Sequence, residues 1–175
     1  MKTNNSLVFI AVVFLVSTYP YAGFAQYESD SELPIEITAD SMEWLNEKRI
    51  AVARGNADAV QGRYKLHAAI LTAHMAEEPP TRSDTVSRIR KIEAEGNVIL
   101  TTPNETARGG EGIYDVENKI ATLLGSVVLT QGDNVLHGQK LIMDLVTGRT
   151  RLEGSDTAIS DDKRRVRAIF NPNDE

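Results

Sequence analysis

The sequence predicts an all-β protein built from a repeated strand unit, and three observations support this fold class. Glycines recur at a fixed interval, apolar residues alternate with polar ones between them, and turn-forming residues follow the glycines. Gly96, Gly125 and Gly154 lie 29 residues apart, and each has strand-like sequence on both sides. A fixed spacing of this kind indicates a repeated supersecondary unit.

Two independent pairs of segments align when the sequence is shifted by 29 residues. Residues 109–115 (GGEGIYD) align with residues 138–144 (GQKLIMD), and residues 96–101 (GNVILT) align with residues 125–130 (GSVVLT). Both alignments use one register, which supports a true repeat over a chance match.

An insertion of residues 76–87 is predicted to interrupt an earlier copy of the repeat. Gly55 aligns with Gly125 at an offset of 70, which exceeds two repeats by 12 residues. We assign the extra residues to 76–87 (AEEPPTRSDTVS), because Pro79-Pro80 and the nearby charges cannot continue a central strand. This segment is therefore expected to be an exposed loop.

The repeat glycines are expected to bend the chain between consecutive strands. Each precedes a polar residue that favours turns, and glycine adopts positive φ at little cost. The pairs are Gly55-Asn56, Gly96-Asn97, Gly125-Ser126 and Gly154-Ser155.

The register also predicts which side chains share a face of the sheet, because equivalent positions in a strand repeat point the same way. The apolar residues alternate with a period of two, as expected for strands with one buried face. One set contains Met42, Trp44, Leu71, Ala73, Met75, Tyr114, Val116, Leu141, Met143 and Leu145. The other contains Ala57, Ala59, Val98, Leu100, Val127, Leu129, Thr157 and Ile159. The two sets would line an elongated apolar interior, and a dry core is the alternative to a ligand-binding one.

The first 25 residues are predicted to be a cleaved signal peptide. Lys2 precedes a ten-residue apolar run, Leu7–Val16, which is too short for a membrane span of about 20 residues. Gly23-Phe24-Ala25 places small residues where a signal peptidase cuts, so cleavage is expected before Gln26. Residues 26–175 would then form a single domain, and an uncleaved anchor is the alternative.

Composition narrows the function classes. No cysteine is present, so a disulfide scaffold is excluded for this exported chain, and a bacterial periplasm fits better than an animal extracellular space. The net charge is −6, and loss of Lys2 makes it −7. A nucleic-acid partner, which requires a basic surface, is therefore not expected.

No catalytic or metal-binding constellation is recognisable. His67, His74 and His137 lack metal-binding spacings, and His67 and His137 occupy equivalent repeat positions, which favours a structural role. Asp115 and Asp144 are also repeat equivalents, so we expect them to form turns at strand ends, with a glycosidase-type carboxylate pair as the alternative. No catalytic residue, cofactor or metal is predicted.

A basic run near the end of the chain has two interpretations. Lys163, Arg164, Arg165 and Arg167 could contact phosphate groups on an anionic ligand. Alternatively, their charge protects a terminal edge strand from indiscriminate pairing.

Several segments in a fixed order resemble the LptA/OstA-like family of lipopolysaccharide export proteins. After the signal peptide these are LPIEITAD (33–40), ARGN (53–56), ARGG (107–110), YD (114–115) and LGSV (124–127). The resemblance covers nearly the whole mature chain. It implies a β-jellyroll, a tapered pair of antiparallel sheets open at both ends, in the periplasm of a Gram-negative bacterium.

The resemblance further implies a protein that bridges an inner-membrane ABC transporter and an outer-membrane translocon. Such proteins join head to tail with each other and with sister jellyrolls, so that lipopolysaccharide passes through the joined interiors. An inner-membrane-anchored sister jellyroll of the same pathway is the first alternative. A carbohydrate-active enzyme on a repetitive β scaffold is the second.

The predicted lipid-facing residues come from the family resemblance and from the shared faces that the repeat register predicts. The family's interior contacts, carried onto matching positions, give Ile35, Ile37, Leu100, Tyr114 and Val116. The shared faces add Trp44, Val98, Val127, Leu129, Leu141 and Met143.

Overall fold

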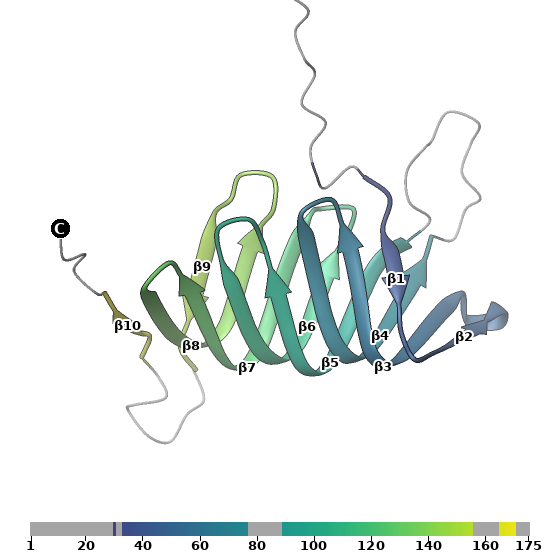
Figure 1. Cartoon of the computed structure of the whole chain (residues 1–175), viewed down its shortest axis with the longest axis horizontal. Helices are drawn as coiled ribbons and strands as arrows, with labels where there is room; N and C mark the ends of the chain where they lie inside the picture. Colours follow the sequence, from purple (N-terminus) through teal and green to yellow (C-terminus); the bar gives the residue numbers. More distant parts are fainter. Residues whose placement is uncertain (1–29, 31–32, 77–88, 156–164, 171–175) are drawn as a thin grey trace, which may run out of the picture.

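The computed structural model describes residues 30, 33–76, 89–155 and 165–170, and it is an all-β structure of ten strands (Figure 1). The strands are β1 (Glu36–Thr38), β2 (Ser41–Leu45), β3 (Ile50–Gln61), β4 (Tyr64–Met75), β5 (Ile89–Thr101), β6 (Thr106–Asp115), β7 (Ile120–Gln131), β8 (Asn134–Asp144), β9 (Thr150–Glu153) and β10 (Arg167–Ile169). A short 3₁₀ helix, Asn46–Lys48, joins β2 to β3.

All ten strands belong to one antiparallel sheet. The long strands β3 to β8 pair in chain order, so each lies beside its neighbour in the sequence. β1 and β2 both pair with β3 at one end of the sheet, and β9 and β10 both pair with β8 at the other. Figure 1 shows these two ends at opposite extremes of the long axis.

The repeat glycines bend single strands in the middle, and the prediction that they separate consecutive strands is wrong. Gly55, Gly96 and Gly125 have φ of 78°, 78° and 82°, and the residues that follow them also have positive φ. Each pair lies inside one long strand, where the pairing register shifts, as in a β-bulge. Gly154 lacks positive φ and follows the end of β9.

The aligned bulges fold the sheet into a trough with two facing walls, and Figure 1 shows the long strands curving through its floor. The first wall consists of β2, β9 and residues 50–54, 70–75, 89–95, 111–115, 120–124 and 140–144. The second wall consists of β1, β10 and residues 57–61, 64–68, 98–101, 106–108, 127–131 and 134–138. The two predicted sheets are thus two halves of one continuous sheet, and the β-jellyroll class is confirmed.

The sheet is interrupted at both of its ends. β1 and β2 act as one edge strand broken at Asp40, whose backbone N–H donates to the Gly55 carbonyl at 2.9 Å. The Asn56 side chain also donates to Asp40 Oδ2 at 3.0 Å. These bonds fix the interruption beside the bulge of β3. β1 therefore forms the edge of the second wall, and β2 forms the edge of the first.

Several predictions concern segments that the structure does not describe. The predicted signal peptide falls within residues 1–29, and Thr157 and Ile159 lie in the range 156–164. The predicted insertion 76–87 lies between β4 and β5, and all of it except Ala76 lies outside the described residues. Among the residues that are described, no helix is long and apolar enough to cross a membrane.

Candidate functional site

The space between the two walls is filled by aliphatic side chains. The largest fully buried ones come from both walls: Leu71, Ile92, Leu123 and Leu141 from the first, and Val98 and Val127 from the second. Burying one such side chain contributes about 1.5–3 kcal/mol, so contact between the walls is a main source of stability. The alternation predicted from the sequence produces this interior directly, because every second residue faces the other wall.

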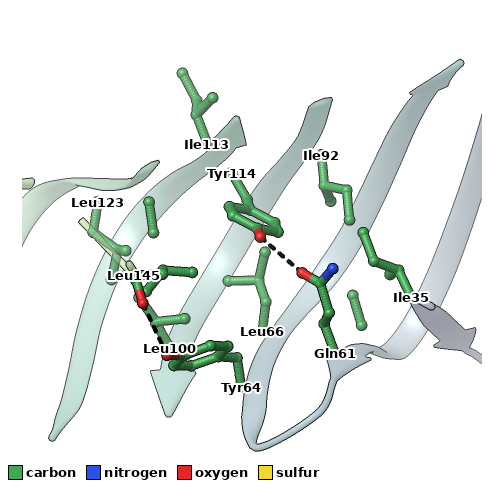
Figure 2. Close-up of a pocket in the computed structure, with 12 residues that line it drawn as sticks. Ile35, Gln61, Tyr64, Leu66, Ile92, Leu100, Ile113, Tyr114, Leu123 and Leu145 are labelled. Carbon is green, nitrogen blue, oxygen red and sulfur yellow. Dashed lines mark hydrogen bonds between the residues drawn. The ribbon is translucent and has the colours of Figure 1, made fainter. Parts of the chain in front are cut away.

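A small apolar pocket lies between the walls, beside Tyr64 and Tyr114 (Figure 2). Its volume is about 20 Å³, enough for a single water-sized sphere. Residues of both walls surround it: Ile35, Ala59, Gln61, Tyr64, Leu66, Ile92, Leu100, Ile113, Tyr114, Ala121, Leu123 and Leu145. Its boundary is almost wholly apolar, so it suits a hydrocarbon and offers little to a polar ligand.

Two tyrosines form hydrogen bonds from one wall to the other beside this pocket, and Figure 2 shows both bonds. Tyr114 Oη donates to Gln61 Oε1 at 2.7 Å. Tyr64 Oη donates to the backbone carbonyl of Leu145 at 3.0 Å. Gln61 Nε2 in turn donates to the Leu33 carbonyl at 2.8 Å, which ties the segment before β1 to the pocket.

Burial, followed by the influence of the nearby Tyr64 and Asp115, raises the pKa of Tyr114 to about 12. Tyr114 therefore remains protonated at neutral pH and keeps its role as the donor to Gln61. Gln61 is itself buried at 5% exposure, and it is the one buried polar side chain of the described core.

The structure brings most of the predicted lipid-facing residues together. Eight are buried in one core: Val98, Leu100, Tyr114, Val116, Val127, Leu129, Leu141 and Met143. Ile35 and Ile37 are partly buried and pack against this core. Their contact with a lipid remains a prediction.

Trp44 lies apart from this core, at the N-terminal end of the trough. Trp44 is 55% exposed and Met42 is 54% exposed. They pair with the buried residues Ala51 and Ala53, so they lie on the same face of the sheet as the core. The apolar inner face therefore continues past the buried core to the open end.

Nine pocket residues were not among the predicted site residues: Ala59, Gln61, Tyr64, Leu66, Ile92, Ile113, Ala121, Leu123 and Leu145. Ile92 with Ala94, and Ala121 with Leu123, show the same period-two alternation as the predicted positions, so that signal could have found them. Gln61 and Tyr64 flank the hairpin turn at Gly62-Arg63, where polar residues are ordinary, and the sequence gives no sign that they face the other wall.

Two of the histidines belong to ion-pair clusters on the outer surface. His67 Nδ1 lies 2.7 Å from Asp58, which also pairs with Lys65 at 3.0 Å. His74 Nε2 lies 2.9 Å from Glu93, which also pairs with Lys91. Within the described parts of the chain, no group of three or more His, Asp or Glu side chains could hold a metal ion. These contacts fit the structural role predicted for His67.

The carboxylates of both clusters have lowered pKa values. Partial burial raises the pKa of Asp58, but hydrogen bonds and charge from Lys65 and His67 outweigh it and lower the value. The hydrogen bond from Lys91, followed by that from His74, lowers the pKa of Glu93.

Asp115 and Asp144 end β6 and β8 and hold the turns that follow, as predicted. Asp115 Oδ1 accepts from the backbone N–H of Asn118 at 2.9 Å, and this bond is the main reason why its pKa is lowered. Asp144 Oδ1 accepts from the backbone N–H of Thr147 at 3.0 Å, which likewise lowers its pKa. Both carboxylates are thus occupied in equivalent turns.

Part of the basic run lies beside a wide groove at the C-terminal end. Lys163 and Arg164 fall outside the described residues, whereas Arg165 and Arg167 are exposed. Arg167 belongs to the edge strand β10, and both arginines line a groove of about 670 Å³ with His137 and Gln139. Edge protection and phosphate contact stay predictions for these cations.

Comparison with known protein families finds one match. Residues 36–149 match the model of the family described as "LptA/(LptD N-terminal domain) LPS transport protein". The uncharacterized protein R00383 of Rhizobium meliloti (strain 1021) is 30% identical over 124 residues, which cover 70% of this chain and 67% of that protein.

A solved structure has the same fold. It is the crystal structure of LptH, the LptA homologous periplasmic component of the conserved lipopolysaccharide transport device from Pseudomonas aeruginosa. The superposition has a TM-score of 0.68 at 21% identity, covering 83% of this chain and all of LptH. At this identity the likeness supports the β-jellyroll fold. The match over residues 36–149 goes further: the chain is a member of the LptA/(LptD N-terminal domain) family of LPS transport proteins.

Proposed function

We propose that this protein is a periplasmic lipopolysaccharide carrier that holds acyl chains between its two walls. It would bridge the inner-membrane ABC transporter and the outer-membrane translocon. The observation that carries the proposal is the apolar inner face, which runs through the trough and continues to Met42 and Trp44 at the open end. The match to an LPS transport family supports the choice of cargo.

The physical chemistry of the cargo favours such a trough. Each methylene group exposed to water costs about 0.8 kcal/mol, and a lipid with several acyl chains carries tens of them. A continuous apolar interior keeps the chains out of water while sugars and phosphates stay outside. Many similar aliphatic contacts also suit sliding, because they provide no single tight site.

The two ends of the trough suit head-to-tail contacts. The interrupted edge strands β1/β2 and β9/β10 can add strands from a partner, which satisfies their free backbone groups. Exposed apolar side chains accompany both edges: Met42 and Trp44 at one end, Ile169 and Phe170 at the other. Partners would be a second copy of this chain or sister jellyrolls of the same machinery.

Export to the periplasm is part of this proposal. It is supported by the signal-like residues 1–25 and by the periplasmic location stated for LptH. The intact mass of the protein recovered from the periplasm should correspond to residues 26–175. A retained N-terminal segment would instead favour the membrane-anchored alternative.

Site-specific photo-crosslinking tests lipid binding. A photoreactive amino acid at Leu100, which is buried and lines the pocket, should crosslink to lipopolysaccharide added to the mature protein. Ile99 is the matched control, because it directly precedes Leu100 in β5 and its side chain lies on the outer face beside His67 and Arg108. Crosslinks at Ile99 but not at Leu100 would contradict an internal path for the lipid.

A further inference from the structure

The edge strands at the N-terminal end of the trough carry only negative charge. Residues 36–45, which contain β1 and β2 and which we call the acidic edge, include Glu36, Asp40 and Glu43 and no lysine or arginine. All three acids are exposed. Glu43 lies 3.4 Å from Arg54 of β3, but both side chains are at least half exposed, so this ion pair is weak.

The edge strands at the C-terminal end are predominantly basic. We call the edge formed by β9 and residues 165–170 the basic edge, because it contains Arg151, Arg165 and Arg167 with a single acid, Glu153. The three arginines are exposed. The contact between Arg151 and Glu153 is long, at 3.8 Å, so Arg151 can exchange it for another carboxylate.

The strand count allows one copy to continue the sheet of another. Each wall has eight strands from edge to edge, the first wall from β2 to β9 and the second from β1 to β10. Neighbouring strands are antiparallel throughout, so the first and last strands of each wall run in opposite directions. A second copy in the same orientation would therefore extend both walls by antiparallel pairing, β9 with β2 and β10 with β1.

The register of the first wall brings opposite charges together when the sheet is continued. One row of directly paired residues on its outer face runs from edge to edge: Glu43, Val52, Thr72, Glu93, Ile113, Thr122, Ile142 and Arg151. One further step in the same register places Arg151 directly opposite Glu43 of the next copy. Opposite charges that face each other across two strands stabilise their pairing.

The register of the second wall has the same consequence. Its outer row contains Thr38, Asp58, His67, Ile99, Arg108, Val128, His137 and Arg167. One further step places Arg167 opposite Thr38 of the next copy, with Glu36 and Asp40 at diagonal positions about 7–8 Å away, within reach of a long side chain. Arg165 then lies level with Asp40, beside the groove of about 670 Å³ that both arginines line.

The apolar inner faces also meet in this register. One inner row contains Met42, Ala53, Leu71, Ala94, Gly112, Leu123, Leu141 and Leu152. Continuing it places the exposed Met42 of the next copy against Leu152. A shift of one residue would turn Met42 to the outer face, and a shift of two would separate Glu43 from Arg151.

We propose that these charges select one arrangement of copies, in which the basic edge of one copy meets the acidic edge of the next with Arg151 opposite Glu43. Joining two acidic edges, or two basic edges, would bring like charges together, so two-fold dimers are disfavoured. Contacts between unlike ends leave one edge free at each end and extend into open chains. This inference rests on the head-to-tail assembly of the proposed function, and it assigns the polarity and the register of that assembly.

Disulfide formation between introduced cysteines tests both assignments. The chain has no cysteine, so only introduced thiols react. Met42→Cys in one preparation and Leu152→Cys in another would face each other in the proposed register, within the Cα separation of about 4.4–6.8 Å that a disulfide needs. Oxidation of the mixture should give heterodimers, and either variant alone should give none. Thr150→Cys in place of Leu152→Cys is the register control, two residues displaced, and should give at least fivefold fewer heterodimers.

The outcomes separate the register from the assembly. Disulfide-linked homodimers of Met42→Cys, or equal yields with Leu152→Cys and Thr150→Cys, would overturn the proposed arrangement. Assemblies seen by light scattering without Met42–Leu152 disulfides would overturn the register and leave head-to-tail assembly standing. A protein that stays monomeric at every concentration would overturn the assembly as well, whereas lipopolysaccharide crosslinks at Leu100 would still support lipid carriage.

Glutamine variants test the charge of the pair without adding repulsion. Glu43→Gln and Arg151→Gln should each raise the dissociation constant of assembly at low salt about two- to fivefold, the effect of an exposed ion pair. The double variant should match the single variants, because each removes the same pair. Glu117→Gln removes an equal charge from the exposed turn between β6 and β7 and should leave assembly unchanged. Additive losses in the double variant, or an equal loss in this control, would overturn the Glu43–Arg151 contact.

Discussion

Individual side chains on the outer surface determine how this protein responds to acid. Asp58 and Glu93 each contact a lysine and a histidine across or along the strands, and Asp115 accepts backbone hydrogen bonds in a turn. All three have lowered pKa values in the folded protein. The folded state therefore binds fewer protons than the unfolded state in the acidic range, and acid favours unfolding.

The free energy of unfolding should accordingly be greatest near neutral pH and should fall as the pH drops below about 5. The contribution of each group is present above its unfolded pKa and disappears as the pH falls through its folded pKa. Urea unfolding between pH 7 and pH 3 measures this change. Asp58→Asn should make the decline shallower, and an unchanged slope in that variant would contradict the assigned cause.

Single elements show how glycine shapes the trough. Gly125 bends β7 with φ of 82°, and a Cβ at this position would meet nothing closer than the backbone of Gly110 at 3.6 Å. The requirement for glycine at this bulge is therefore conformational rather than steric, because the left-handed region costs other residues about 1–2 kcal/mol.

Gly125→Ala should destabilise the protein by about 1–2 kcal/mol for that reason. Gly110→Ala is the matched control, because Gly110 lies opposite in β6, lacks positive φ, and would place its Cβ at an ordinary contact distance of 3.7 Å. Its effect on the free energy of unfolding should stay within about 0.5 kcal/mol. Equal losses in both variants would show that this bulge does not depend on the backbone conformation of Gly125.

The elements also show how far the sequence predicts the fold and where it stops. Alternation correctly placed Val98, Leu100, Val127 and Leu129 in the interior, because a period of two fixes the face of each side chain. The glycines marked real changes of direction. A bulge within a strand and a turn between two strands both place a glycine and a polar residue between two alternating apolar runs. The sequence pattern therefore predicts a bend but does not distinguish a bend within a strand from a turn between strands.

The candidate site was only partly predictable for a related reason. Its apolar lining follows the alternation, whereas Gln61 and Tyr64 are polar residues beside a hairpin turn. They matter because the turn at Gly62-Arg63 meets the rim of the opposite wall near Leu145, 81 residues from Tyr64 in the chain. A contact of that separation arises from closure of the whole trough.

The whole molecule is a trough with an open apolar face at its N-terminal end. Met42 and Trp44 are more than half exposed there, although they share the inner face with Ala51 and Ala53. Large apolar side chains in such a position favour association with a partner that covers them. The proposed head-to-tail assembly would cover them with the other end of a second copy.

The mature protein should therefore form larger assemblies as its concentration rises, measurable by light scattering coupled to size exclusion. Met42→Lys combined with Trp44→Lys should shift it to monomers, because charge on an exposed edge opposes strand addition. Ile113→Lys is the control, since Ile113 is 38% exposed on the central strand β6, away from both ends. Assemblies that persist in the double variant would contradict docking through this edge.

The continuous sheet gives the trough a way to change its interior volume without unfolding. Backbone hydrogen bonds join each strand to its neighbours within a wall, and the aligned bulges lie along the floor between the walls. Moving the walls apart therefore works as a hinge that leaves the ladders intact and breaks only side-chain bonds and apolar contacts. An acyl chain entering between the walls would replace those apolar contacts with equivalent ones. The net free energy of opening around a lipid can thus remain small, so the same interior can be a stable core and a passage.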